Sequence, residues 1–204
     1  MTGSGLLAWR VGALLLALVQ LPVLLRTGAD PSQSDFANYF TPAVVLAHRG
    51  EVGALYDRDA FDLALRRTGI VGLGSFVPHP PANALWLLPF AAQPAAVAKA
   101  LWSGVLLGAI AVTILAVARL RAGLSPAMAT VLVLAPTLAI RNGLAFGQPY
   151  LILGALLALG CLALERGREF LAGFLLGLGV SFKPYSLLIG TLFHGDALNP
   201  RSPA

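Results

Sequence analysis

Polar side chains that could do chemistry stand at isolated points in this sequence, between long apolar runs. The first is Asp35, in the segment SDFANYFTP that follows the first apolar run. A carboxylate beside an apolar surface can act as a general base that takes a proton from a hydroxyl group. Spacing alone favours another interpretation, a solvated loop aspartate or a helix N-cap, because Ser34 and Asp35 both suit that position.

A histidine and two cationic side chains are further candidates. His79 lies between prolines in the segment PHPP, which keep it out of a helix. It could contact a ligand or shuttle a proton, or it could be an ordinary interfacial histidine. Arg141 and Lys183 each border an apolar run, with Gln148 and Tyr150 near the arginine in sequence. Together these suit an anionic head group; the alternatives are a helix-end cation for Arg141 and a snorkelling side chain for Lys183.

The composition indicates what must position these side chains. Of the 204 residues, 57% are hydrophobic and 11% are charged, whereas a soluble domain carries about a quarter charged residues. We therefore expect an all-α integral membrane protein. The net charge of +5 does not indicate nucleic-acid binding, because the basic residues are scattered singly or in pairs between apolar runs.

Motifs of soluble enzymes are missing from the sequence. It has no Walker loop, no dinucleotide-binding glycine motif, no nucleophile elbow and no metal-binding helix. The one cysteine, Cys161, lies in an apolar run without metal-ligand spacing around it. We expect no metal, because the carboxylates of the first loop stand alone apart from Asp57 and Asp59, and divalent ions need several oxygen ligands together. No cofactor is expected either.

Apolar runs of about 20 residues predict helices that cross a bilayer. The first run, 6–25, is longer than the apolar region of a signal peptide, so we expect it to be a retained span. A single transmembrane domain is expected over residues 1–194, followed by a polar tail at 195–204. Its spans are expected near 6–25, 95–118, 125–144, 150–164, 170–182 and 185–193.

The loop after the first span is expected to lie on the outer face of the membrane. Residues 27–80 hold six of the nine acidic residues, and the segment 43–67 has the pattern of short amphipathic helices that lie in the interface plane. Prolines prevent a regular helix up to around Ala82, and the apolar part that follows is too short to span the bilayer.

Basic pairs predict the cytoplasmic side of the membrane. They follow the runs 95–118 and 150–164, which alternate in direction with the run between them. This topology places the unusual polar residues on one face, the outer one. They are Asp35, His79, Arg141, Gln148 and Lys183.

Short motifs occur along the chain in a recognisable order. After the first apolar run come D-F-x-x-Y (35–39), a glycine followed by L-Y-D (55–57), and P-x-P-P (78–81). Further on are G-Q-P-Y (147–150), the glycine pattern that starts at Ala172, and K-P (183–184). This ordered set resembles glycosyltransferase family 87, membrane mannosyltransferases of the GT-C class that use polyprenyl-phosphate sugars.

The resemblance implies a multi-span helical bundle with interfacial helices in the first outer loop, above an active site on the outer face. Asp35 matches the position of the catalytic base because it heads D-F-x-x-Y, and Asp30 does not. The base would take a proton from an acceptor hydroxyl as that oxygen attacks the anomeric carbon. The polyprenyl phosphate would leave, and the configuration would invert.

A departing phosphate calls for nearby cations. We expect Lys183, Arg141 and His79 to bind it, with Lys183 favoured by the K-P placement. Sugar or acceptor hydroxyls are expected to bind Tyr39, Tyr56 and Gln148. The implied partners are a polyprenyl-phosphate-linked hexose (mannose by resemblance), a lipid or glycan acceptor and the lipid bilayer. The implied location is the plasma membrane, with the active face periplasmic or extracellular.

Family members usually carry further spans, so we expect the chain to correspond to the N-terminal half of such a protein or to a short form. The alternative to a transferase is a non-catalytic membrane protein. Such a protein would be part of a transporter, a subunit that binds a lipid-linked sugar, or a truncated inactive relative. Transporters often contain internal repeats, and no convincing repeat relates residues 1–100 to 100–200, which disfavours a transporter.

Overall fold

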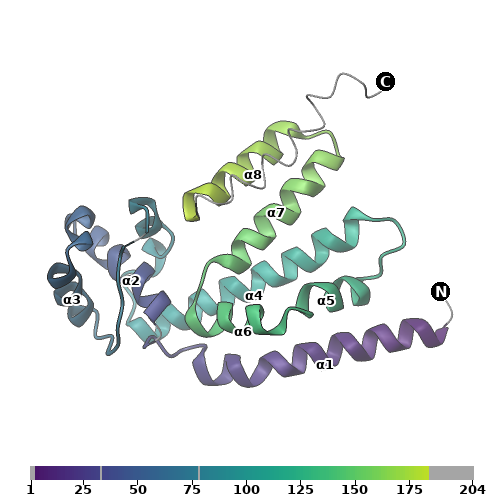
Figure 1. Cartoon of the computed structure of the whole chain (residues 1–204), viewed down its shortest axis with the longest axis horizontal. Helices are drawn as coiled ribbons and strands as arrows, with labels where there is room; N and C mark the ends of the chain where they lie inside the picture. Colours follow the sequence, from purple (N-terminus) through teal and green to yellow (C-terminus); the bar gives the residue numbers. More distant parts are fainter. Residues whose placement is uncertain (1–2, 33, 78, 184–204) are drawn as a thin grey trace.

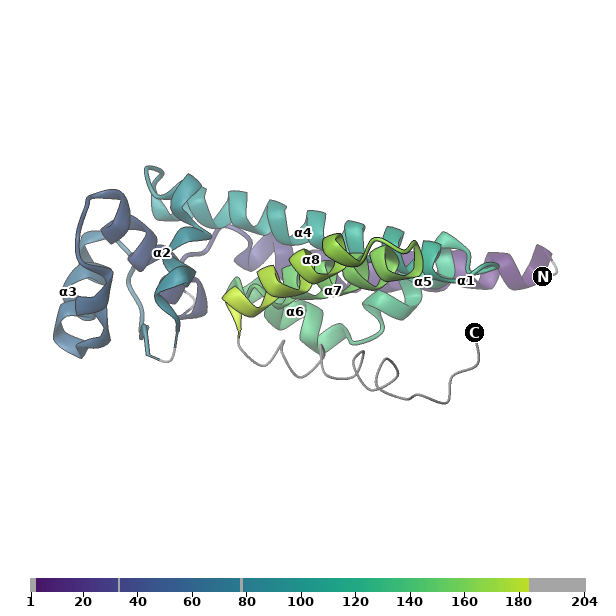
Figure 2. The same ribbon diagram turned by 90° about the horizontal axis from the view of Figure 1, so that it is seen from above.

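The computed structural model describes residues 3–32, 34–77 and 79–183, and every regular element within them is an α-helix or a 3-10 helix. The all-α prediction is therefore confirmed for these residues. Figure 1 shows a bundle of longer helices, with the helices of the first loop gathered at the end away from the N-terminus. The view from above in Figure 2 shows the same division along the length of the molecule.

Two helices are long and apolar enough to cross a membrane. They are α1 (Gly3–Thr27) and α4 (Ala95–Leu120), with candidate spans at Ser4–Thr27 and Ala95–Leu120. In α1, only 6% of an 18-residue apolar stretch is buried inside the protein. The corresponding share in α4 is 28%. Leucine side chains that are left exposed on a continuous helix suit the hydrocarbon of a bilayer, where all backbone groups must be bonded internally.

The segment 125–144, expected as one span, is divided into two helices. These are α5 (Pro126–Leu134) and α6 (Thr137–Phe146), bent by 72° relative to each other. The division falls at Pro136, whose ring and missing N–H disrupt a continuous helix. Ser125 caps α5 by accepting a bond from the Met128 N–H at 3.3 Å. If the bent pair counts as one span, the described residues contain up to three.

Two shorter apolar helices complete the described part of the bundle. Helix α7 (Tyr150–Glu165) packs against both α4 and α8 (Glu169–Phe182). They cover the segments 150–164 and 170–182 where spans were expected. The span expected near 185–193 and the tail at 195–204 lie outside the described residues.

The first loop folds into short helices around α2 (Ser34–Ala47). These are α3 (Arg58–Arg67) and three 3-10 helices, η1 (Val52–Tyr56), η2 (Pro81–Leu85) and η3 (Leu88–Phe90). The amphipathic helices expected over 43–67 are present, but the first begins earlier, at Ser34. Helix α2 starts there because its aromatic residues, among them Phe36 and Phe40, are buried against the bundle end and the 3-10 helices.

Candidate active site

Asp35 lies in the first turn of α2, and its side chain is half-buried. Its Oδ2 accepts a hydrogen bond of 2.8 Å from Nε2 of Gln148, which comes from the turn between α6 and α7. Two expected site residues from distant parts of the sequence are therefore in direct contact. The other oxygen, Oδ1, has no hydrogen-bond partner among the described residues, so it is available to a substrate hydroxyl.

The turn that carries Gln148 begins with a glycine that the structure requires. Gly147 ends α6 in the left-handed conformation, with φ of 68°. A Cβ at this position would lie 3.2 Å from the Cβ of Phe36 and 3.4 Å from the indole of Trp102. The Trp102 Nε1 donates to the Gly147 carbonyl at 2.7 Å. Glycine therefore allows α2 and α4 to approach the turn closely, and the tryptophan fixes its position.

Lys99 is a buried cation that was not among the site residues expected from the sequence. Its side chain is fully buried in α4, where Nζ donates to the Leu144 carbonyl at 2.8 Å and lies 5.8 Å from the ring centroid of Phe36. Leu144 is in the last turn of α6, where the helix dipole favours a cation, and Asp30 is the carboxylate that interacts with Lys99 electrostatically. A single lysine inside an apolar run was the available signal. Its contacts show that it positions the α6–α7 turn.

Tyr39, Tyr56 and His79 lie together beside α2. The ring centroid of Tyr39, one helical turn after Asp35, is 4.9 Å from that of His79. The Tyr56 hydroxyl donates to the His79 carbonyl, and the Tyr56 ring centroid is 5.1 Å from that of Phe76. These contacts join α2, η1 and the proline-rich segment, so three of the expected site residues share one location.

His79 is neutral in the folded protein at pH 7. Burial, with the positive charge of Lys183 as the second cause, lowers the pKa of its imidazole from 6.5 to about 4. Its Nδ1 lies 3.4 Å from Nδ2 of Asn83, an amide nitrogen that can only donate. The neutral ring keeps one N–H group. His79 can therefore offer an anion one neutral N–H group and no positive charge at pH 7.

Lys183, the residue that follows α8, completes the arrangement. Its Nζ lies 5.9 Å from the ring centroid of Tyr150, and its charge acts on His79. Contacts, short chain segments and the electrostatic interaction between Lys183 and His79 connect a group of residues that we name the Asp35 cluster. It consists of Asp35, Gln148, Tyr150, Lys183, His79 and Tyr39.

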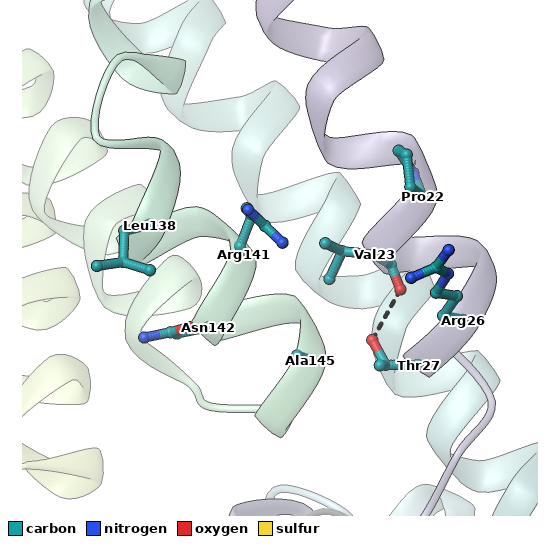
Figure 3. A pocket seen from close by; sticks show the side chains of 8 residues that line it. All are labelled: Pro22, Val23, Arg26, Thr27, Leu138, Arg141, Asn142 and Ala145. Atoms are coloured by element: carbon teal, nitrogen blue, oxygen red, sulfur yellow. Dashed lines mark hydrogen bonds between the residues drawn. The ribbon is translucent and has the colours of Figure 1, made fainter.

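Arg141 has no contact with the Asp35 cluster among the described residues. It extends from α6 toward the last turns of α1, into a pocket that Arg26 also lines (Figure 3). The expected phosphate-binding residues therefore fall into two groups, Lys183 and His79 in one and Arg141 in the other. Within the described residues, no three side chains of His, Cys, Asp and Glu lie close enough to hold a metal ion.

The Asp35 cluster, together with the neighbouring Tyr56, combines complementary chemical groups. A carboxylate oxygen can accept a proton, and the Gln148 amide orients that carboxylate. A lysine can stabilise a departing anion, and the phenols of Tyr39 and Tyr56 can bind hydroxyl groups. The arrangement suits a group transfer in which a hydroxyl is deprotonated and an anion leaves.

Comparison with known proteins identifies one family. No curated protein and no solved structure matches the chain. The family model for glycosyltransferase family 87 matches residues 76–196, a range that includes His79, Lys99, Gln148 and Lys183 but begins after Asp35. The match covers more than half of the chain, agrees with the resemblance carried by the ordered motifs, and indicates a glycosyltransferase. The chain therefore belongs to glycosyltransferase family 87.

Proposed function

We propose that the protein transfers a hexose, specifically mannose, from a polyprenyl-phosphate sugar to a lipid or glycan acceptor, with inversion at the anomeric carbon. The observation that carries the proposal is the Asp35 cluster. It joins a carboxylate, a cation and a phenol at one end of an apolar helical bundle (Figure 1).

Asp35 acts as the base in the proposed reaction. Its Oδ1 takes the proton from the acceptor hydroxyl. The acceptor oxygen then forms a bond to the anomeric carbon from the face opposite the phosphate. The bond between the anomeric carbon and the phosphate oxygen breaks, and its electron pair leaves with the polyprenyl phosphate. Gln148 holds the carboxylate through the 2.8 Å bond to Oδ2, so that Oδ1 keeps its orientation.

Lys183 and His79 bind the leaving phosphate in this proposal. Lys183 supplies the positive charge, and the neutral His79 ring supplies one N–H donor, because burial lowers its pKa to about 4. Tyr39 and Tyr56 are assigned to sugar or acceptor hydroxyls, and Gln148 to an acceptor hydroxyl beside Asp35. A donor with a polyprenyl chain fits this placement, since the chain can remain in the hydrocarbon beside α1 and α4 while its phosphate reaches the cluster at the bundle end.

Basic residues at the opposite helix ends support an outer-face site on the plasma membrane. Arg119 lies in the last turn of α4, and Arg166 and Arg168 lie between α7 and α8. In Figure 1 these helix ends lie away from α2 and the Asp35 cluster. Because positive residues favour the cytoplasmic side, we assign the Asp35 cluster to the periplasmic or extracellular side.

The proposed function can be tested by comparing transfer from a lipid-linked sugar donor with transfer from a nucleotide-linked one. Proteoliposomes that contain the full chain would be incubated with a lipid acceptor extract and either radiolabelled polyprenyl-phosphate mannose or GDP-mannose. We expect label in the acceptor fraction from the lipid-linked donor alone. Transfer from GDP-mannose would refute the proposed donor, and retention of the lipid-linked donor without transfer would favour the non-catalytic, lipid-linked-sugar-binding alternative.

A further inference from the structure

A second cationic site lies between the C-terminal part of α1 and α6. It is an open pocket of about 330 Å³. Figure 3 shows the side chain of Arg141 extending from α6 toward α1, on which Arg26 lies, and both line the pocket with Asn142. The pocket also has an apolar wall, to which Pro22, Val23 and Leu138 contribute. A ligand in this pocket would therefore meet both guanidinium groups and apolar side chains.

The two arginines have no counter-charge in the described part of the chain. Neither forms an ion pair or a side-chain hydrogen bond with the described residues, and none of the residues that line the pocket is acidic. Both side chains are exposed, so their guanidinium groups are free to meet an anion. Two unpaired arginines that share one pocket repel each other, and an anion between them would remove that repulsion.

The level of the pocket relative to the lipid bilayer indicates which kind of ligand can reach it. Arg26 is the penultimate residue of the candidate span Ser4–Thr27, at the end that leads to α2. Arg141 stands in the second half of the bent pair α5–α6, close to the same end. If α1 spans the bilayer, both guanidinium groups lie at the level of lipid head groups, while Val23 and Leu138 face the outer part of the hydrocarbon.

We propose that this pocket binds the phosphate group of an anionic membrane lipid, with the start of an acyl chain against its apolar wall. Arg26 and Arg141 bind the phosphate oxygens through charge-assisted hydrogen bonds, and the Asn142 amide can add a neutral one. The site is separate from the Asp35 cluster and requires only that the protein lies in a membrane. A free phosphate ion would use the two arginines but would leave the apolar wall uncovered.

Lipid titration followed by native mass spectrometry tests this site. The purified full chain in detergent would be titrated with dioleoyl phosphatidic acid, with dioleoylglycerol as the matched lipid that lacks the phosphate. Inorganic phosphate would be added as a competitor. We expect bound phosphatidic acid, no retained dioleoylglycerol, and displacement by inorganic phosphate only in large molar excess. Equal retention of both lipids, or displacement by equimolar phosphate, would overturn the assignment to a lipid phosphate.

Substitutions assign the binding to these residues. Arg26→Gln and Arg141→Gln should each weaken phosphatidic acid binding by roughly tenfold, and the double variant by more. Asn142→Asp places a carboxylate beside the arginines without changing side-chain size, and should weaken binding similarly. Arg66→Gln, which removes an exposed arginine of α3, is the matched control and should bind like the wild type. Wild-type affinity in both the double variant and Asn142→Asp would refute the site, provided that their thermal unfolding midpoints are unchanged.

Discussion

Gln148 donates a hydrogen bond of 2.8 Å to the carboxylate of Asp35, although 113 residues separate the two. The bond joins the first turn of α2 to the turn between α6 and α7. Three segments hold it in place: α2 supplies the acid, the α6–α7 turn supplies the amide, and α4 fixes that turn through Lys99 and Trp102. The site is therefore assembled by tertiary packing.

Removal of the Gln148 amide should affect turnover more than binding. Gln148→Leu keeps the size of the side chain but leaves Asp35 without its partner, so the carboxylate can rotate away from the acceptor. We expect kcat to fall by about 10–100-fold with a small change in KM for the donor. Steady-state kinetics in proteoliposomes measure both values. Gln93→Leu, at an exposed position between η3 and α4, should have no effect, and a Gln148→Leu enzyme with wild-type kcat would refute the positioning role.

Gly147→Ala should destabilise the fold at the same turn. An alanine at φ of 68° is strained, and its Cβ would press on Phe36 and Trp102 at 3.2 and 3.4 Å. We expect a loss of roughly 1–3 kcal/mol in the free energy of unfolding. The loss is measured by comparing the thermal unfolding midpoints of Gly147→Ala and Gly108→Ala in detergent. Gly108 lies in α4 with no atom within 4 Å of an added Cβ, so that variant should be neutral or slightly stabilised; equal midpoints for the two variants would be incompatible with this geometry.

Some elements of this arrangement could be predicted from the sequence and others could not. The apolar runs 6–25 and 95–118 predict two long helices, because a span needs a continuous apolar run. Pro136 signals the bend between α5 and α6, but its place in the middle of an apolar run concealed that signal. Lys99 carried a similar signal, a lone cation in such a run, and was overlooked for the same reason.

Residue order could not reveal which polar groups meet. The expected topology placed Arg141 and Lys183 on the same face of the membrane. Two residues on the same face need not belong to the same site. The packing of α6 against α1 places Arg141 beside Arg26, whereas α8 places Lys183 beside Tyr150. The neutrality of His79 depends on burial, which is a property of the packed fold and not of the segment PHPP.

The stability of the protein should depend on pH through His79. Its folded-state pKa of about 4 is below the ordinary value of 6.5, so between these values the unfolded state binds the proton more readily than the folded state. The contribution to stability is present above pH 6.5 and is lost as the pH falls toward 4. We expect the thermal unfolding midpoint of the wild type to fall more over this window than that of His79→Gln. His48→Gln, at an exposed histidine, should follow the wild type, and parallel curves for wild type and His79→Gln would contradict the buried neutral state.

Lys183→Gln should change both the pKa of His79 and the KM for the polyprenyl-phosphate donor. Since the Lys183 charge is the second cause of the lowered His79 pKa, its removal should raise that pKa, which remains below 6.5 because burial persists. NMR titration of the His79 ring measures the change. The KM for the polyprenyl-phosphate donor should rise by about tenfold or more as a charge-assisted bond is lost. Arg166→Gln, at the other end of α7, is the control, and an unchanged His79 pKa in Lys183→Gln would place the lysine outside the cluster.

Replacement of Asp35 is the decisive measurement. Asp35→Asn keeps an oxygen that can accept from Gln148 but cannot take a proton, so it separates the base from the hydrogen-bond network. Transfer from radiolabelled polyprenyl-phosphate mannose would be measured for wild type, Asp35→Asn and Asp59→Asn, which removes an exposed carboxylate of the same loop. We expect a decrease of about 10²–10⁴-fold for Asp35→Asn and wild-type turnover for Asp59→Asn. Undiminished turnover in Asp35→Asn would show that Asp35 is not the base.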